Sequence, residues 1–106
     1  MTKIELDPGI CGFITVIEVT SKDKNNVEVN VNSECHYIEN AGFKNIKINI
    51  KKEFSKKLHN TKIYKKSSNY IPHLSCPIYV GIFKAIEAET RMLLPEDVSI
   101  KFGKKQ

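Results

Sequence analysis

The first pattern along the chain is a two-residue alternation of apolar and polar side chains. It is strict over residues 27–32 and returns over 46–50, where every second residue is isoleucine. Such alternation is typical of strands with one buried face. Residues 13–20 are a further strand candidate, and the polar stretch 21–26 that follows them predicts an antiparallel hairpin. A last alternating stretch, 98–102, predicts a closing strand.

Helical spacing of apolar residues appears most clearly after Pro77. Proline suits the first position of a helix, because the N–H that it lacks would be unsatisfied there. The apolar stripe that follows predicts a helix over 78–94. Ser33 is a good N-cap and Gly42 a good stop, so a shorter helix is expected over 34–40.

The remaining stretches carry weaker signals. A brief helix is expected over 54–58, whereas 59–70 has no clear period and is interpreted as an irregular connection. The fold class that follows is α+β, with a small, largely antiparallel sheet and helices on one face. We expect one domain over 1–103 and a disordered tail over 104–106.

Composition narrows the class of protein. A chain of 106 residues with 41% hydrophobic residues can form one core without a metal or a disulfide. No apolar run approaches the roughly 18 residues that a membrane-spanning helix needs, and the start lacks the apolar stretch of a signal peptide. We therefore expect a cytoplasmic protein. Three cysteines, an odd number, argue against a complete disulfide framework.

The positive charge is concentrated in one segment, Lys44–Lys66, which we call the basic segment. It holds nine lysines and one acidic residue, Glu53, so its charge is +8 while the whole chain carries +5. Such a segment can bind nucleic acid or an acidic protein, or it can be a solvated, mobile connector. Its aromatic residues do not alternate regularly with lysines, so nucleic-acid binding by base stacking is not expected.

Each of the three cysteines lies at a predicted element boundary. Cys11 is in a loop before a strand, Cys35 is at a strand-to-helix junction, and Cys76 precedes the long helix. The positive end of a helix stabilises a thiolate, so the pKa of Cys76 is expected to be lowered. Boundary positions at one edge of a sheet can also converge in space.

Three converging thiolates and one further ligand would suit zinc or an iron–sulfur cluster. The chain has no C-x-x-C motif, so the spacing is not that of a zinc finger. The alternative is that Cys11 and Cys35 are small buried hydrophobic residues. His59, in the basic segment, is expected on the surface. The candidates for the fourth ligand are His73, His36 and Asp7.

Several segments resemble a family of small proteins from anaerobic bacteria and archaea for which no activity is established. The similar segments are 7–13, with the sequence DPGICGF, and 73–77, with the sequence HLSCP. KAIE at 84–87 and LPEDV at 94–98 extend the resemblance over nearly the whole chain.

The layout is also similar, more distantly, to the U-type iron–sulfur scaffold proteins of the NifU N-terminal and IscU type. In that family a cysteine before glycine, a cysteine at a helix start and a cysteine opening a long C-terminal helix hold the cluster. The resemblance implies that Cys11 with Gly12, Cys35 and Cys76 are the ligands here. Tyr70–Pro72 loosely matches the proline-bearing stretch before the third cysteine.

This chain departs from the scaffold pattern at several positions. Phe13 stands where that family has an aspartate, and His73 is three residues from Cys76 instead of adjacent. No glycines flank Cys35, and a strand is expected after the long helix. These departures put scaffold function in doubt more than the three-cysteine site. Cys76 also begins a partial match to the C-P-x-P motif of sulfur-carrier proteins, which Ile78 and Tyr79 break.

Three functions stay open at this stage. The first is a small metal-binding protein, non-catalytic or scaffold-like, with Cys11, Cys35, Cys76 and His73 as ligands of zinc or an iron–sulfur cluster. The second is a persulfide or redox thiol carrier that uses Cys76 alone. The third is a basic interaction module without a metal. No hydrolytic constellation stands out, which argues against an enzyme. The strand at 46–50 could be an edge that pairs with a second copy.

Overall fold

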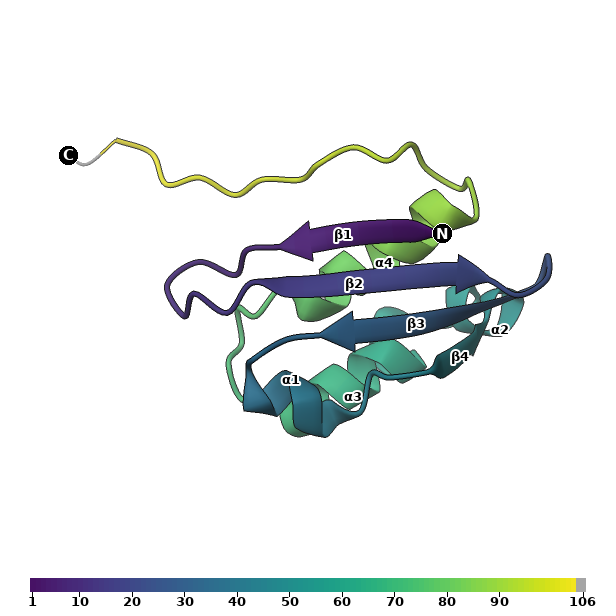
Figure 1. Cartoon of the computed structure of the whole chain (residues 1–106), viewed down its shortest axis with the longest axis horizontal. Coiled ribbons are helices and arrows are strands. Elements are labelled where there is room, and N and C mark those ends of the chain that lie inside the picture. The colour runs from purple at the N-terminus through teal and green to yellow at the C-terminus, as the bar shows by residue number, and fades with distance from the viewer. Residues whose placement is uncertain (105–106) are drawn as a thin grey trace.

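A computed structural model describes residues 1–104 and has a four-stranded antiparallel sheet at its centre (Figure 1). The strands are β1 (Thr2–Leu6), β2 (Thr15–Ser21), β3 (Asn26–Asn32) and β4 (Ile46–Asn49), and they lie in the order β1-β2-β3-β4. The predicted hairpin is confirmed as β2–β3, with Ile17 opposite Val31. The strand expected over 46–50 is β4, which lies at one edge of the sheet.

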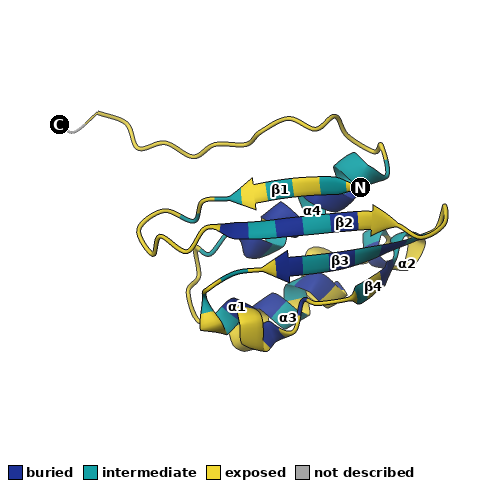
Figure 2. Ribbon diagram, in the orientation of Figure 1, coloured by how far each residue is buried: buried dark blue, intermediate teal, exposed yellow. Residues whose placement is uncertain are grey.

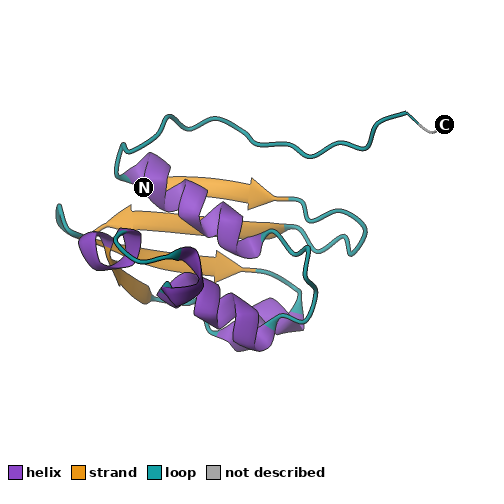
Figure 3. Cartoon of the chain, turned by 180° about the vertical axis from the view of Figure 1, so that it is seen from behind, coloured by secondary structure: helices purple, strands orange, loops and turns teal. Residues whose placement is uncertain are grey.

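Within residues 1–104, the sheet is accompanied by four α-helices and one short 3₁₀-helix. They are α1 (His36–Ala41), α2 (Ile50–Phe54), the 3₁₀-helix η1 (Leu58–Asn60), α3 (Lys62–Tyr70) and α4 (Ile78–Glu89). Figure 3 shows α3 and α4 lying across one face of the sheet, as the α+β prediction requires. α4 packs on β1 and β2, and α3 packs between α1 and α4.

The core lies between the sheet and these helices. Buried residues alternate along β2 and β3 because successive strand side chains point to opposite faces (Figure 2). They meet the apolar stripe of α4, where Ile78, Ile82 and Ile86 are completely buried. The alternation in the sequence therefore identified the buried face of these strands correctly.

Two helix predictions were wrong in position, and one helix was not predicted. The short first helix begins at His36 with Cys35 as its N-cap, although it ends at Gly42 as expected. The helix expected over 54–58 occurs earlier, as α2. The stretch 59–70, expected to be irregular, contains α3.

The long helix is shorter than predicted because it ends in a Schellman motif. Arg91 adopts a left-handed conformation with φ of 63°, and its N–H donates to the carbonyl of Ala88 at 3.2 Å. The N–H of Met92 donates to the carbonyl of Glu87 at 2.9 Å, which completes the motif. The helix begins at Ile78 as predicted, but Pro77 is its N-cap instead of its first helical residue.

The two ends of the chain also differ from the sequence predictions. β1 was not predicted, although Ile4 and Leu6 alternate with charged residues. The strand expected over 98–102 does not form, and this segment is extended and exposed with no strand partner. Of the tail expected to be disordered, Lys104 lies in a loop and residues 105–106 lie outside the described part of the chain.

Candidate functional site

Two of the three cysteines are brought to the same end of the sheet by the antiparallel strands. Cys11 lies in the connection between Leu6, where β1 ends, and Thr15, where β2 begins. Asn32, the last residue of β3, is opposite Val16, and Cys35 follows three residues later. The β1–β2 connection and the β3–α1 junction are therefore neighbours (Figure 1).

Cys76 reaches this end because of the direction in which α4 crosses the sheet. At the far end of α4, Glu89 accepts hydrogen bonds from Thr2 Oγ1 at 2.6 Å and from the Ser21 N–H at 3.0 Å. In the first half of the helix, Gly81 lies directly against Ile17 and Leu6. The start of α4, and Cys76 before it, therefore lies at the end of the sheet where Leu6 and Thr15 lie.

The pKa of Cys76 is raised above its ordinary value. Partial burial raises it most, the N–H of Ile78 opposes this by hydrogen bonding, and negative charges on Cys35 and Cys11 raise it further. The expectation of a lowered pKa was wrong, since loss of water around the sulfur outweighs the helix terminus. Cys11, Cys35 and Cys76 all lie at this end of the sheet, and we call them the thiol cluster.

A hydroxyl pair holds the Cys35 junction in place. The Cys35 N–H donates to Ser33 Oγ at 3.1 Å, and Ser33 Oγ lies 2.8 Å from Thr15 Oγ1. Thr15 is completely buried and also donates to the carbonyl of Phe13 at 3.0 Å. One threonine thus ties the end of the Cys11 loop to the turn that carries Cys35.

The loop around Cys11 has its own turn structure. Gly9 and Gly12 have φ of 96° and 72°, values that glycine adopts readily. The Gly12 N–H donates to the Gly9 carbonyl at 3.0 Å, and Asp7 Oδ1 accepts from the Gly9 N–H at 3.0 Å. Asp7, a candidate fourth ligand, therefore stabilises the turn. Cys11 itself is exposed on this loop.

The two histidine candidates lie against one tyrosine. The ring of Tyr37 is 4.3 Å from that of His36 and 5.6 Å, edge to face, from that of His73. The Cys76 N–H donates to the His73 carbonyl at 3.3 Å, so the chain turns back here and brings the two residues together. His59 is exposed in η1, as expected.

The described side chains do not form a complete ligand sphere. Within residues 1–104, no group of three or more histidine, cysteine, aspartate or glutamate side chains could hold a metal ion as it stands. No disulfide joins the cysteines, and Cys35 and Cys76 are each partly buried against the core.

A surface hollow of about 230 Å³ opens beside Cys76. The rings of Tyr64 and Tyr79 meet edge to face at 5.1 Å, and both residues line the hollow. His73 and Ser68 contribute polar groups to the same wall. Cys76 therefore faces both the thiol cluster and a small hollow that is partly aromatic.

The basic segment is folded, which overturns its interpretation as a mobile connector. It includes β4, α2, η1 and most of α3. Lys66 Nζ donates to the carbonyl of Ala41 at 3.2 Å, and the other eight lysines are exposed. Phe54 and Tyr64 make ring contacts with Phe83 and Tyr79 of α4.

A family model now places the chain among known sequences. The model of DUF6951, a family of unknown function, matches residues 2–102. The chain belongs to DUF6951. No curated protein and no solved structure matches it.

The DUF6951 match spans the three cysteines, His73 and the extended tail up to Phe102. None of the helices within residues 1–104 has the length and apolar content to cross a bilayer. Sequence reasoning about this DUF6951 chain missed Thr15 and Tyr37, and it assigned Ser33 the N-cap position that Cys35 occupies. A threonine that begins a strand and a serine that ends one were the available signals for the hydroxyl pair, whereas nothing in the sequence indicated the histidine–tyrosine contacts.

Proposed function

We propose that this chain is a small metal-binding protein whose thiol cluster, Cys11, Cys35 and Cys76, binds zinc or an iron–sulfur cluster. The observation that carries the proposal is the convergence of three cysteines from three separate segments at one end of the sheet. Thiolates are the ligands that both groups prefer. The role is non-catalytic or scaffold-like, in line with the resemblance to the U-type scaffold proteins.

The donor set fits a cation electrostatically. Negative charges on Cys35 and Cys11 each raise the pKa of Cys76, so three thiolates together are unfavourable without a cation. A bound metal ion removes this repulsion and favours deprotonation of its ligands. When bound, zinc or a cluster would supply a structural crosslink or a redox centre at this end of the sheet.

The Cys11 loop is the segment whose adjustment completes the site. Cys11 is exposed, and Gly9 and Gly12 give its loop conformational freedom. His73 is the best fourth ligand, because the turn to Cys76 already holds its backbone nearby. Coordination would require the His73 ring to leave its edge contact with Tyr37.

The decisive experiment is metal analysis with an absorption spectrum on untagged protein purified without oxygen. We expect near-stoichiometric zinc, or iron with a visible sulfide-to-iron band. Alanine variants of Cys11, Cys35 and Cys76 should each lose the metal, whereas His59→Ala should keep it. His73→Ala should weaken binding. A folded protein that contains no metal and takes up neither zinc nor cobalt would contradict the proposal.

A second candidate, a persulfide or redox thiol carrier that uses Cys76 alone, is favoured by the hollow beside Cys76. Its raised pKa counts against it, because less thiolate is present at neutral pH. Treatment of the metal-free protein with inorganic polysulfide separates the two functions. If the protein is a carrier, Cys76 should retain a persulfide in the Cys11→Ala and Cys35→Ala variants. If it is a metal centre, the function does not require Cys76 to hold a persulfide.

We also propose a cytoplasmic location, since free thiols are typical of a reducing compartment. We do not expect nucleic-acid binding. Phe54 and Tyr64, two aromatic residues of the basic segment, make ring contacts with α4. The exposed lysines of the basic segment could instead bind an acidic protein. The affinity of this binding should fall steeply as the salt concentration rises.

A further inference from the structure

The outer side of β1 and the extended residues 98–102 both lack a strand partner in the described chain. β1 pairs with β2 on one side only, so its other side presents free N–H and C=O groups. Residues 98–102 are extended, and no hydrogen bond or ion pair within the described chain involves them. Their apolar side chains are exposed, Val98 to 63%, Ile100 to 92% and Phe102 to 101%.

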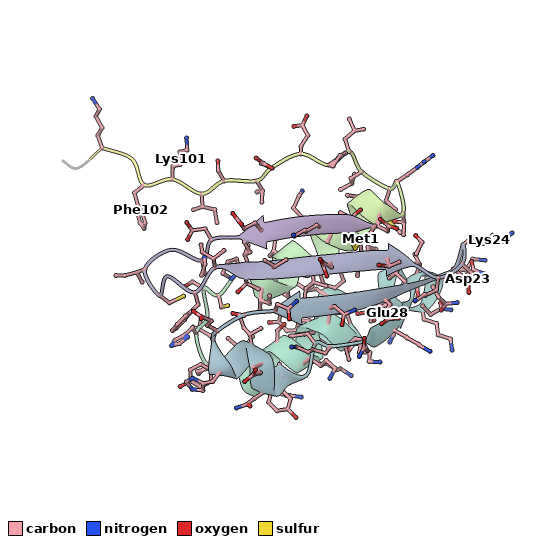
Figure 4. The ribbon with its side chains drawn as sticks, viewed as in Figure 1. Met1, Asp23, Lys24, Glu28, Lys101 and Phe102 are labelled. Carbon is pink, nitrogen blue, oxygen red and sulfur yellow. The ribbon has the colours of Figure 1, made fainter. Side chains whose placement is uncertain are left out.

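The tail has the pattern of a strand with one apolar face. Val98, Ile100 and Phe102 share one side of the extended backbone, and Ser99 and Lys101 share the other. Figure 4 shows Lys101 and Phe102 pointing in opposite directions from the tail. An exposed apolar strand of this kind is a feature that folded proteins normally cover.

β1 has the complementary pattern. Ile4 and Leu6 are half-buried toward α4, whereas Lys3 and Glu5 are exposed on the other face. A parallel pairing that sets Ile100 beside Ile4 also sets Phe102 beside Leu6. The same register brings the opposite charges of Lys101 and Glu5 together on the outer face, which favours the pairing.

Local contacts restrain the link between α4 and the tail. The Schellman motif fixes Arg91 and Met92, and the Glu96 N–H donates to the Leu94 carbonyl at 2.8 Å. Pro95 further restricts the backbone of Leu94. The tail leaves α4 on the β1 side of the molecule and runs alongside β1 in the same direction, without pairing with it (Figure 1).

We propose that residues 98–102 of one copy add as a fifth strand to the β1 edge of a second copy, in a reciprocal dimer. In such an exchange, the tail of each copy pairs with the open β1 edge of the other copy, so both β1 edges and both tails gain hydrogen-bond partners. The other edge is a weaker acceptor, since β4 has only four residues and carries Lys47 on its exposed side. The dimer does not depend on a metal in the thiol cluster.

Sedimentation equilibrium of the reduced full-length protein tests the proposal. We expect a concentration-dependent dimer for the wild type. Ile100→Glu puts a charge on the apolar face and should raise the dimer dissociation constant about tenfold or more. Ser99→Glu puts the same charge on the outer face beside Lys3 and should leave the dimer intact. Removal of residues 98–106 should give a monomer with an unchanged circular dichroism spectrum.

Nuclear Overhauser spectra of a mixture of isotope-labelled and unlabelled protein distinguish contacts between two copies from contacts within one chain. Contacts between Ile100 of one copy and Ile4 of the other are expected. Three results would overturn the proposal: a wild type that stays monomeric at millimolar concentration, a dimer that persists without residues 98–106, or contacts of Ile100 with Ile4 of its own chain only.

Discussion

Thr15 and Ser33 join the two segments that carry Cys11 and Cys35. Their hydroxyl oxygens lie 2.8 Å apart across the start of β2 and the end of β3, and Ser33 Oγ also accepts the Cys35 N–H. Thr15 is completely buried, so water cannot replace the bond. The position of the thiol cluster therefore depends on a polar contact inside the sheet.

Replacement of Thr15 by valine should destabilise the protein and weaken metal binding. Valine keeps the shape but removes a buried hydroxyl, which leaves Ser33 short of a partner and costs about 1–2 kcal/mol of unfolding free energy. Urea denaturation and zinc titration measure the two effects. Thr20→Val, at an exposed position of the same strand, is the control and should change neither. Equal behaviour of the two variants would show that the hydroxyl pair has no such role.

The strands were predictable because their buried face imposes a simple period on the sequence. β3 shows the strongest alternation and was predicted correctly over 27–32. α3 was missed for the opposite reason, since only Ile63 and Ser67 of this helix are buried. Its start is fixed by Thr61, which accepts the Tyr64 N–H, and by a carboxylate from another helix. No local sequence pattern can show that second contact.

Glu53 supplies that carboxylate, and its substitution should lower the free energy of unfolding more than most substitutions outside the core. It is 3% exposed and accepts the N–H groups of Lys62 and Ile63 at 3.0 and 2.9 Å. Glu53→Ala leaves two amide groups at the start of α3 without this acceptor, so we expect a loss of about 2–3 kcal/mol by urea denaturation. Glu39→Ala, at an exposed position of α1, is the control and should cost much less. A loss for Glu53→Ala as small as that of the control would contradict this role.

Glu89 should make stability depend on pH in the acid range. Burial raises its pKa, but hydrogen bonds from Thr2 and Ser21 outweigh burial and leave the pKa below its ordinary value of 4.5. A lowered folded-state pKa adds stability that is fully present above the unfolded value and is lost as the pH falls through the folded value. Glu89→Gln should therefore flatten the decline of unfolding free energy below about pH 4.5.

Glu87→Gln is the matched control for this prediction, because Glu87 lies on the same helix and its carboxylate makes no hydrogen bond within the described chain. Its stability profile should follow that of the wild type. At neutral pH, Glu89→Gln should cost about 1 kcal/mol, since the amide still accepts hydrogen bonds but without charge. A wild-type profile for Glu89→Gln would show that the lowered pKa does not contribute to stability.

The site was predictable only as far as element boundaries could be placed. The sequence placed each cysteine at an element boundary and left open whether these boundaries share an end of the sheet. The direction of α4, which brings Cys76 to that end, depends on Glu89 contacting Thr2 and Ser21. Those contacts join residues 87 and 68 positions apart, and no local pattern reports them. The same limit explains the wrong sign for the pKa of Cys76, because partial burial of its sulfur follows from tertiary packing.

The last prediction concerns the reactivity of Cys76 in the reduced, metal-free protein. Its pKa lies above the ordinary value of 9.0, first because of burial and then because of the charges on Cys35 and Cys11. Alkylation by iodoacetamide requires the thiolate, so the rate at Cys76 should rise with pH to a midpoint above 9.0. Mass spectrometry of the Cys76 peptide measures this rate at each pH.

Variants of the other two cysteines separate the causes of this shift. Cys35→Ser removes the thiolate whose charge has the larger effect on the pKa of Cys76, so it should lower the midpoint. Cys11→Ser should lower the midpoint less. Neither variant should bring it down to 9.0, since burial of the sulfur remains. A midpoint that is the same in all three proteins would mean that the thiols do not interact electrostatically. The proposed three-cysteine site would then be supported only by the position of the three cysteines at one end of the sheet.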